Sequence, residues 1–175
     1  MSATFAWKED NGAATGSPSH GTSRTSSRTE QNYKATDDST TAYSSSPITA
    51  GNNSYEKFQY GVFSGSFNSV FAGLWTHTAG ALGTGLTLKG VVTSTYTTPA
   101  AATNAALTVD MTSVLAIASG QTVLFSTTGP EAASPGATLS AAGYSQYLVT
   151  QLQTSTSAAA GDTATTTVTL QYSEN

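Results

Sequence analysis

The side chains that could carry out chemistry in this chain are few and lie far apart in the sequence. The two histidines are His20, within a polar segment, and His77, which closely follows Trp75. A hydrolytic triad needs a base beside a nucleophile and a third group that orients the base. His77 could be that base, because serines are abundant, but no G-x-S-x-G turn accompanies it. We therefore interpret His77 as structural and expect no enzymatic activity.

The acidic residues give no stronger indication of catalysis or metal binding. Asp110, Glu131 and Asp162 are isolated in the sequence; they could converge in the fold, but each also suits a turn or a strand edge. The pair Asp37 and Asp38 lacks the spaced ligands of a calcium loop. The absence of cysteine excludes disulfides, thiolate metal sites and thiol nucleophiles. We expect no metal and no cofactor.

Two other features could bind ligands. The glycine-rich segment 80–85 has no Lys-Ser/Thr pair after it and opens no helical pattern, so we interpret it as a flexible loop rather than a phosphate loop. Four aromatic residues could stack on sugars or could fill a core or a subunit interface: Trp75, Tyr96, Tyr144 and Tyr147. We favour the core or interface.

Charged side chains are nearly absent from the larger part of the chain. Between Phe58 and Ser173 there are four of them: Lys89, Asp110, Glu131 and Asp162. The surface of an ordinary soluble monomer is about a quarter to a third charged. A surface of hydroxyl and methyl groups is better suited to contact with another protein copy. The composition therefore favours an assembled structural protein over an enzyme.

The elements that position these residues are predicted to be strands. Threonine, valine and tyrosine are frequent, whereas strong helix formers are scarce, which indicates an all-β domain. The expected strands are 58–63, 67–75, 86–96, 107–111, 121–125, 147–153 and 165–172, with residues 154–162 as a long hairpin connection. Segments 100–106 and 112–119 could each hold a turn of helix. About seven strands at this spacing predict a β-sandwich or jelly-roll-like domain.

The first part of the chain has a different character. Residues 1–57 hold five of the six basic and six of the ten acidic residues, and large apolar side chains are rare between residues 12 and 46. Such a segment cannot by itself offset its ordering entropy. We predict an extended, mostly irregular N-terminal arm over residues 1–54 and a β-sandwich body over residues 55–175. Phe5 and Trp7, on alternate residues of a short strand, would anchor the arm.

The start of the chain also bears on its location. It lacks the basic residues and long apolar run of a secretory signal, and no stretch approaches the ~20 apolar residues that span a membrane. The net charge of −4 gives no basic field for nucleic acid. We expect a complete, soluble chain made in the cytoplasm, with no direct contact to nucleic acid and none to membrane.

Several segments resemble parts of small virion structural proteins of tailed bacteriophages. The middle segment reads AGNNSYEKF at 50–58, and similarity extends to residues 4–7, 11–12, 63–68, 147–152, 160–162 and 169–174. It is weak between residues 79 and 140. The resemblance implies a non-enzymatic protein that decorates or cements capsids or sits in the neck or tail, and it carries over no catalytic residues.

The resemblance and the composition lead to one functional expectation. We expect a virion protein, made in the host cytoplasm, that decorates or cements the capsid shell through arm and β-edge contacts. Its partners would be the major capsid protein or neck and tail proteins, and the chain would form a homo-oligomer. A neck or tail component is the alternative, and a glycan-binding or adhesion module is the rival from another class.

The residues expected to anchor the arm or line an interface are mainly aromatic. They are Phe5, Trp7, Tyr33, Tyr43, Tyr55, Glu56, Lys57 and Trp75. Glu56 and Lys57, beside Tyr55, would fix the junction between arm and body. On this hypothesis, deletion of residues 1–46 leaves a folded body that no longer assembles.

Overall fold

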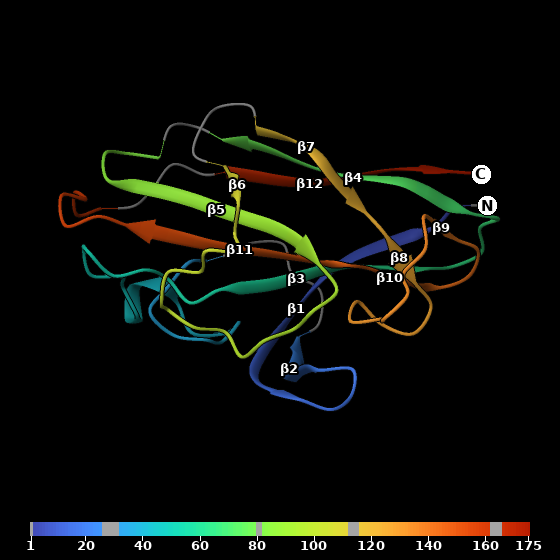
Figure 1. The fold of residues 1–175 in the computed structure, drawn as a ribbon, viewed down its shortest axis with the longest axis horizontal. Coiled ribbons are helices and arrows are strands. Elements are labelled where there is room, and N and C mark those ends of the chain that lie inside the picture. The colour runs from blue at the N-terminus through green and yellow to red at the C-terminus, as the bar shows by residue number, and fades with distance from the viewer. Residues whose placement is uncertain (1, 26–31, 80–81, 112–115, 162–165) are drawn as a thin grey trace.

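The protein is a β-sandwich of two antiparallel sheets, seen in a computed structural model (Figure 1). The structure describes residues 2–25, 32–79, 82–111, 116–161 and 166–175. Within these residues the one helical element is the short 3-10 helix η1 (Tyr43–Ser45). The all-β fold expected from the abundance of β-branched residues is thus confirmed.

The larger sheet contains eight strands, among them the N-terminal strands β1 and β2. Its path is β2-β1-β3-β11-β5-β6, and β10 and β8 extend it beside β3. The bounds of these strands are β1 (Thr4–Thr15), β2 (His20–Thr25), β3 (Lys57–Ser64), β5 (Leu86–Thr93), β6 (Val109–Asp110), β8 (Phe125–Ser126), β10 (Gly143–Ser145) and β11 (Tyr147–Thr154). We call it the large sheet.

The second sheet has the order β12-β4-β7, with β9 paired to the start of β4. Its strands are β4 (Val70–Ala79), β7 (Ala116–Val123), β9 (Thr138–Leu139) and β12 (Thr166–Glu174). We call it the small sheet. Val168 and Leu170 of β12 lie opposite His77 and Trp75 of β4, and this pairing places all four on the face toward the large sheet.

The main core lies between the two sheets and is centred on Trp75, whose side chain is 1% exposed. Its indole packs against Gly90 of β5: a Cβ atom at that glycine would stand 2.5 Å from the ring carbon Cη2. Gly90 therefore permits the close approach of the ring, because any larger residue would collide with it. The apolar alternation of β11 and β12 supplies much of the remaining core, as the sequence pattern predicted.

The outer face of the large sheet is covered by a second apolar cluster. Phe58 and Tyr60 of β3 and Tyr147 and Val149 of β11 project to this side, where Tyr96 and Leu107 from the β5–β6 connection cover them. The rings meet at an angle, with the centroids of Phe58 and Tyr96 4.6 Å apart. Such arrangements suit the quadrupoles of aromatic rings. The large sheet is thus buried on both faces over this region.

Residues 4–25 do not form the extended, irregular arm that their composition predicted, whereas residues 32–54 contain no strand and only the short helix η1. Strand β1 lies inside the large sheet, paired with β3 from Thr4 to Asp10 and with β2 from Glu9 to Thr15. The polar composition of this segment predicted an irregular arm because its charged residues have partners that are distant in the sequence. A local sequence pattern does not reveal such partners. The structure gives no physical boundary between residues 54 and 55, since Ser54 and Tyr55 already bond to Leu152 and Lys34.

Other expected elements differ in detail. The predicted hairpin between β11 and β12 is not formed, because the two strands belong to different sheets (Figure 1). The run 107–111 holds only the two-residue β6, and residues 121–125 divide between β7 and β8. Residues 100–106 are not helical; of the other expected helical turn, residues 112–115 lie outside the described residues and 116–119 belong to β7.

Candidate functional site

Several charged residues of the first 57 positions meet in the interior rather than on the surface. Lys57, at the start of β3, places its Nζ atom 3.2 Å from Glu9 Oε1 and donates to the Asp38 carbonyl at 2.9 Å. Both side chains of the Lys57–Glu9 pair are 1% exposed. Removing one partner of such a pair would leave a buried charge without compensation. The pair therefore ties β1, β3 and the segment around Asp38 together.

The segment after residue 32 closes over this pair through Lys34 and Asp38. Lys34 Nζ lies 2.7 Å from Asp38 Oδ1 and donates to the Thr41 carbonyl. Burial acts to raise the pKa of Asp38, but hydrogen bonds from Lys34 and from the backbone of Thr41 and Thr40 outweigh it and lower that pKa well below its usual value. Asp37 accepts from Asn11 at 3.0 Å and from the Gly12 amide at 2.7 Å. These carboxylates are occupied in structural contacts.

Glu56 and Gln151 hold the loop that covers the outer face of the large sheet. Glu56 accepts hydrogen bonds from the Ala100 amide and from the side chain of Asn104. The amide of Gln151 donates to the carbonyls of Ser54, Ala100 and Ala102 at 2.9–3.3 Å. A buried amide with this many partners fixes the backbone that it contacts. Glu56, just before β3, and Lys57, its first residue, thus contact different segments. Glu56 bonds to the loop of Ala100 and Asn104, and Lys57 bonds to Glu9 and to the segment around Asp38.

The closest approach to a catalytic constellation is a cluster of Asp10, Tyr147, Glu131 and Arg24. The Tyr147 hydroxyl donates to Asp10 Oδ2 at 2.6 Å and lies 3.5 Å from Glu131 Oε2. Arg24 reaches both carboxylates, with Nη2 2.7 Å from Glu131 Oε1 and Nε 3.5 Å from Asp10 Oδ2. Asp10 is fully buried, and its Oδ1 atom has no hydrogen-bond partner in the described part of the chain. A second pair of carboxylates, Glu9 and Asp37, converges on the side-chain amide of Asn11.

The electrostatics of this cluster do not favour proton transfer. Burial raises the pKa of Asp10, against the lowering influence of the Tyr147 hydrogen bond and the Arg24 charge. Burial also raises the pKa of Tyr147, and its hydrogen bond to Asp10 raises it further. A phenol whose pKa is raised is a poor acid, and it is seldom present as the phenolate that would act as a base. We interpret the cluster as a link between β1, β2, β11 and the segment around Glu131.

The aromatic residues expected at an interface are mostly part of the fold itself. Phe5 and Trp7 are half-buried, with their rings 5.3 Å apart, and pack against the main core. The Tyr33 hydroxyl donates to Thr150 at 2.9 Å, and Tyr55 is half-buried. Tyr43, on η1, is 48% exposed. Of the expected interface residues, Tyr43 is therefore the one whose ring stands largely in solvent.

The candidate sugar platform is not formed in this structure. Trp75, Tyr96 and Tyr147 are all buried, with exposed fractions of 2% or less. Tyr144 is half-buried against Tyr60. Rings inside the fold cannot stack on a sugar, so the preference for a core role over a platform is borne out for the three buried rings.

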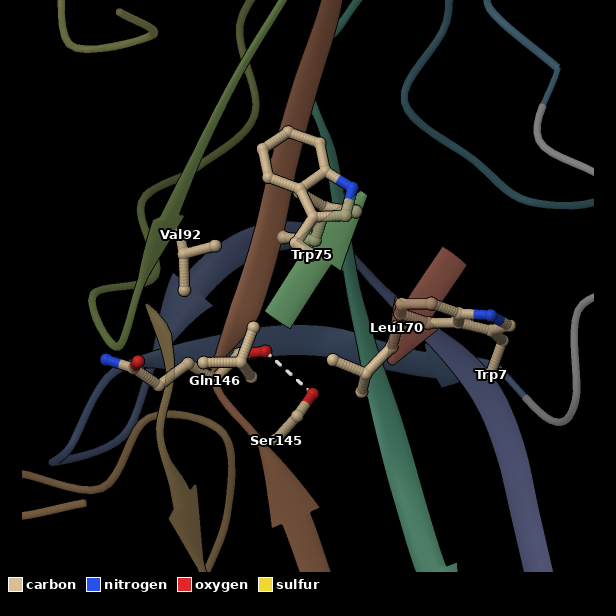
Figure 2. Close-up of a pocket in the computed structure, with 8 residues that line it drawn as sticks. Trp7, Trp75, Val92, Ser145, Gln146 and Leu170 are labelled. Atoms are coloured by element: carbon tan, nitrogen blue, oxygen red, sulfur yellow. Dashed lines mark hydrogen bonds between the residues drawn. The ribbon is translucent and has the colours of Figure 1, made fainter. Parts of the chain in front are cut away.

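One cavity between the sheets, shown in Figure 2, is too small for a ligand. Its volume of about 10 Å³ is close to the space of one water molecule. Trp7, Trp75 and Leu170 line it, together with Ser145 and Gln146, and the Ser145 hydroxyl donates to the Gln146 carbonyl at 2.9 Å. The cavity is a packing gap and gives no basis for catalysis.

The remaining sequence candidates are scattered. His77 is 3% exposed inside the sandwich, whereas His20 lies on β2 and contacts the Gly21 carbonyl through Nδ1. Asp110, on the edge strand β6, pairs with Lys89 at 3.0 Å on the surface. Glu131 pairs instead with Arg24 of β2. Asp162 and part of segment 80–85 lie outside the described residues. Residues 2–25, 32–79, 82–111, 116–161 and 166–175 contain no group of three potential metal ligands.

The surface that stands out is the outer face of the small sheet. Because cross-strand partners share a face, the strands β4, β7 and β12 present their outward side chains together. We define the outer face by Phe71, Leu74, Thr76, Thr122, Thr167, Thr169, Gln171 and Ser173. None of these residues is charged, and Phe71 is 37% exposed. This face combines hydroxyl, methyl and aromatic groups on a regular surface.

One lateral side of the sandwich leaves strands without neighbours. Strand β12 pairs with β4 on one side, and the described residues place nothing on its other side. The first half of β1, Thr4 to Lys8, likewise pairs only with β3 among the described strands. Contacts of Phe5 with Tyr172, at 6.2 Å between rings, show that both free edges lie on the same side. We call this pair of edges the open side.

Sequence reasoning missed the polar clusters and identified the outer face only as a property of composition. The partners of Asp10 are Tyr147 and Arg24, separated by more than a hundred residues, so no spacing rule could have joined them. The scarcity of charges after Phe58 was a usable signal, because the four strands of the small sheet all follow Phe58 and carry Glu174 as their one charged residue.

No protein-family model, curated protein or solved structure matches this chain. In the described part of the chain, no helix has the length and apolar character required to cross a membrane.

Proposed function

We propose that this chain is a non-enzymatic structural protein of a tailed-phage virion that decorates or cements the capsid shell. The observation that carries the proposal is the uncharged outer face of the small sheet beside the open side. Contact between uncharged faces avoids the desolvation of ions that accompanies a charged interface. Many weak contacts of this kind, repeated around a symmetric particle, produce strong overall attachment.

The sequence resemblance and this surface together support the proposed location on the capsid shell. A protein that covers a shell needs a broad contact area rather than a cleft, and the small sheet offers one. The contacts would be made by strand edges and by the outer face. An extended arm has no part in the proposal, because Phe5 and Trp7 pack in the fold of their own chain. A neck or tail component would use the same surface.

The test is whether the chain is a component of phage particles. Particles of a tailed phage that encodes the chain are purified on a density gradient, and an antibody raised against the purified protein is applied for immunogold electron microscopy. We expect regular labelling over the head in many copies. Labelling confined to the neck or tail would select the alternative location, and absence of the chain from purified particles would refute a virion role.

Two matched variants test whether the outer face of the small sheet is needed for incorporation into particles. Phe71→Glu adds a charge to the outer face of the small sheet at an exposed position. Ala133→Glu adds the same charge at an exposed position outside that face. The proposal expects the first variant to be depleted from particles and the second to be incorporated normally. Equal incorporation of both would remove the outer face from the proposal.

A further inference from the structure

The free edge of β12 differs from the other sheet edges of this protein. It runs over nine residues, and from Thr166 to Ser173 it contains no charge, proline or glycine. A long edge strand of this kind presents a row of unpaired backbone donors and acceptors. Natural proteins usually protect such an edge with charges, bulges or shortness. Strand β12 has a single register irregularity, between Gln171 and Ser173 near its end.

The other edges carry these protections. Strand β2 has six residues and contains Arg24, which is engaged with Glu131. Strand β6 has two residues and includes Asp110. Strand β7 has Gly120, and its register with β4 shifts between Thr122 and Ile117. The free half of β1, residues 4–8, is short and ends with Lys8. Among the described edges, β12 is therefore the longest run without a charge, proline or glycine.

The half-buried side chains beside β12 supply an independent observation. Val168 and Tyr172 of β12 and Phe5 and Trp7 of β1 are each half-buried and border the main core on the open side. An added strand beside β12 would cover the parts of these side chains that remain in solvent. Burial of apolar surface contributes about 25 cal/mol per Å². Edge pairing and apolar burial would thus act together at one place.

The absence of charge along β12, its last residue excepted, permits a second copy of the same strand as its partner. A two-fold axis through β12 places each residue near the centre opposite itself or a close neighbour in the partner, so a charge there would meet a like charge. Thr167, Thr169 and Gln171, which face outward, are all neutral. Glu174 lies at the end of the strand and is held by the Ser2 hydroxyl and the Ala3 amide of its own chain. The strand is therefore suited to pair with itself.

We propose that two copies of this chain associate through their β12 strands, which pair antiparallel across a two-fold axis and join the two small sheets into one. The biological use of the pair rests on the proposed virion function, since it would double the uncharged outer face available to a shell. The pairing itself is a property of the isolated protein and is tested separately from particle binding.

The experiment measures the mass of the full chain and two lysine variants by light scattering and sedimentation over a range of concentrations. Thr169→Lys places a charge on β12, and Thr76→Lys places the same charge on its direct cross-strand partner in the interior strand β4. Far-UV circular dichroism confirms that each variant is folded. We expect dimers for the wild type and Thr76→Lys, and a dimer dissociation constant raised about tenfold or more for Thr169→Lys.

Disulfide trapping locates the axis without depending on those variants. Because the chain has no cysteine, single substitutions Thr167→Cys, Thr169→Cys and Gln171→Cys report only contacts between copies. We expect rapid crosslinking at one of these positions and none at Thr122→Cys, which lies on β7 of the same face. A monomeric wild type, equal weakening by both lysine variants, or crosslinking at Thr122 alone would overturn β12 pairing. None of these results would alter the outcome of the particle test.

Discussion

At the level of single residues, the hydroxyl of Tyr147 is what makes the burial of Asp10 tolerable. It donates the 2.6 Å hydrogen bond to a carboxylate that has no exposed surface. The ring itself packs among Phe58, Tyr60 and Tyr96, so it has both an apolar and a polar role. These two roles can be separated by removing the hydroxyl alone.

We predict that Tyr147→Phe lowers the free energy of unfolding by about 1.5–3 kcal/mol, because a hydrogen bond to a buried charged group is lost. Urea denaturation of the variant measures this change. The matched control is Tyr144→Phe, which loses a hydroxyl from a half-buried ring and should change stability by less than about 0.5 kcal/mol. Equal effects of the two substitutions would show that the Asp10 contact contributes nothing specific.

At the level of elements, the N-terminal strands are part of the sandwich and bring the Lys57–Glu9 pair with them. The earlier hypothesis, that removal of residues 1–46 leaves a folded body, conflicts with this arrangement. Truncation would remove β1 and β2, expose the edge of β3 and leave Lys57 buried without Glu9. Loss of one partner of a buried ion pair alone costs about 3–5 kcal/mol.

We therefore predict that the chain lacking residues 1–46 does not fold. Its circular dichroism should show no cooperative thermal transition, whereas the full chain should show one. A smaller change, Glu9→Gln, tests the ion pair with the strands intact and should lower stability without abolishing folding. A truncated chain that melts cooperatively would contradict the integrated architecture and restore the separate arm.

Several element-level features could be read from the sequence and others could not. The strands near 58–63, 147–153 and 165–172 were predicted because alternation is local to each strand. The pairing of β12 with β4 rather than β11 could not be predicted, since the choice of sheet depends on which apolar faces meet across the core. The strand character of β1 was indicated only by Phe5 and Trp7, because its polar half pairs with distant residues.

At the level of the whole molecule, stability should depend on the protonation of His77. Its imidazole lies inside the sandwich, and neither nitrogen has a hydrogen-bond partner in the part of the chain that the structure describes. Burial lowers the pKa of His77 from its ordinary value of 6.5. Below pH 6.5 the unfolded chain therefore binds a proton that the folded chain resists, and stability falls as the pH falls.

The prediction is that the free energy of unfolding decreases when the pH is lowered from about 7.5 to about 5.5. Urea denaturation at a series of pH values measures the slope. In His77→Leu this decrease should be smaller, because the titrating group is gone, whereas His20→Leu, which retains His77, should behave as the wild type does. A slope unchanged in His77→Leu would show that another group is responsible.

The sequence by itself determined the all-β class, most strand positions and the uncharged character of the later strands, because composition and two-residue alternation are local properties. The tertiary structure alone determined which partners the charged residues of the N-terminal segment have. Glu9 reaches Lys57 and Asp10 reaches Tyr147 only once β1, β3 and β11 have paired in the large sheet, and these contacts hold the N-terminal strands in the sandwich. It also decided that Phe5, Trp7 and Trp75 pack within the fold, and that β12 is left as a free edge. These outcomes depend on contacts between residues far apart in the chain, whose partners no local pattern specifies.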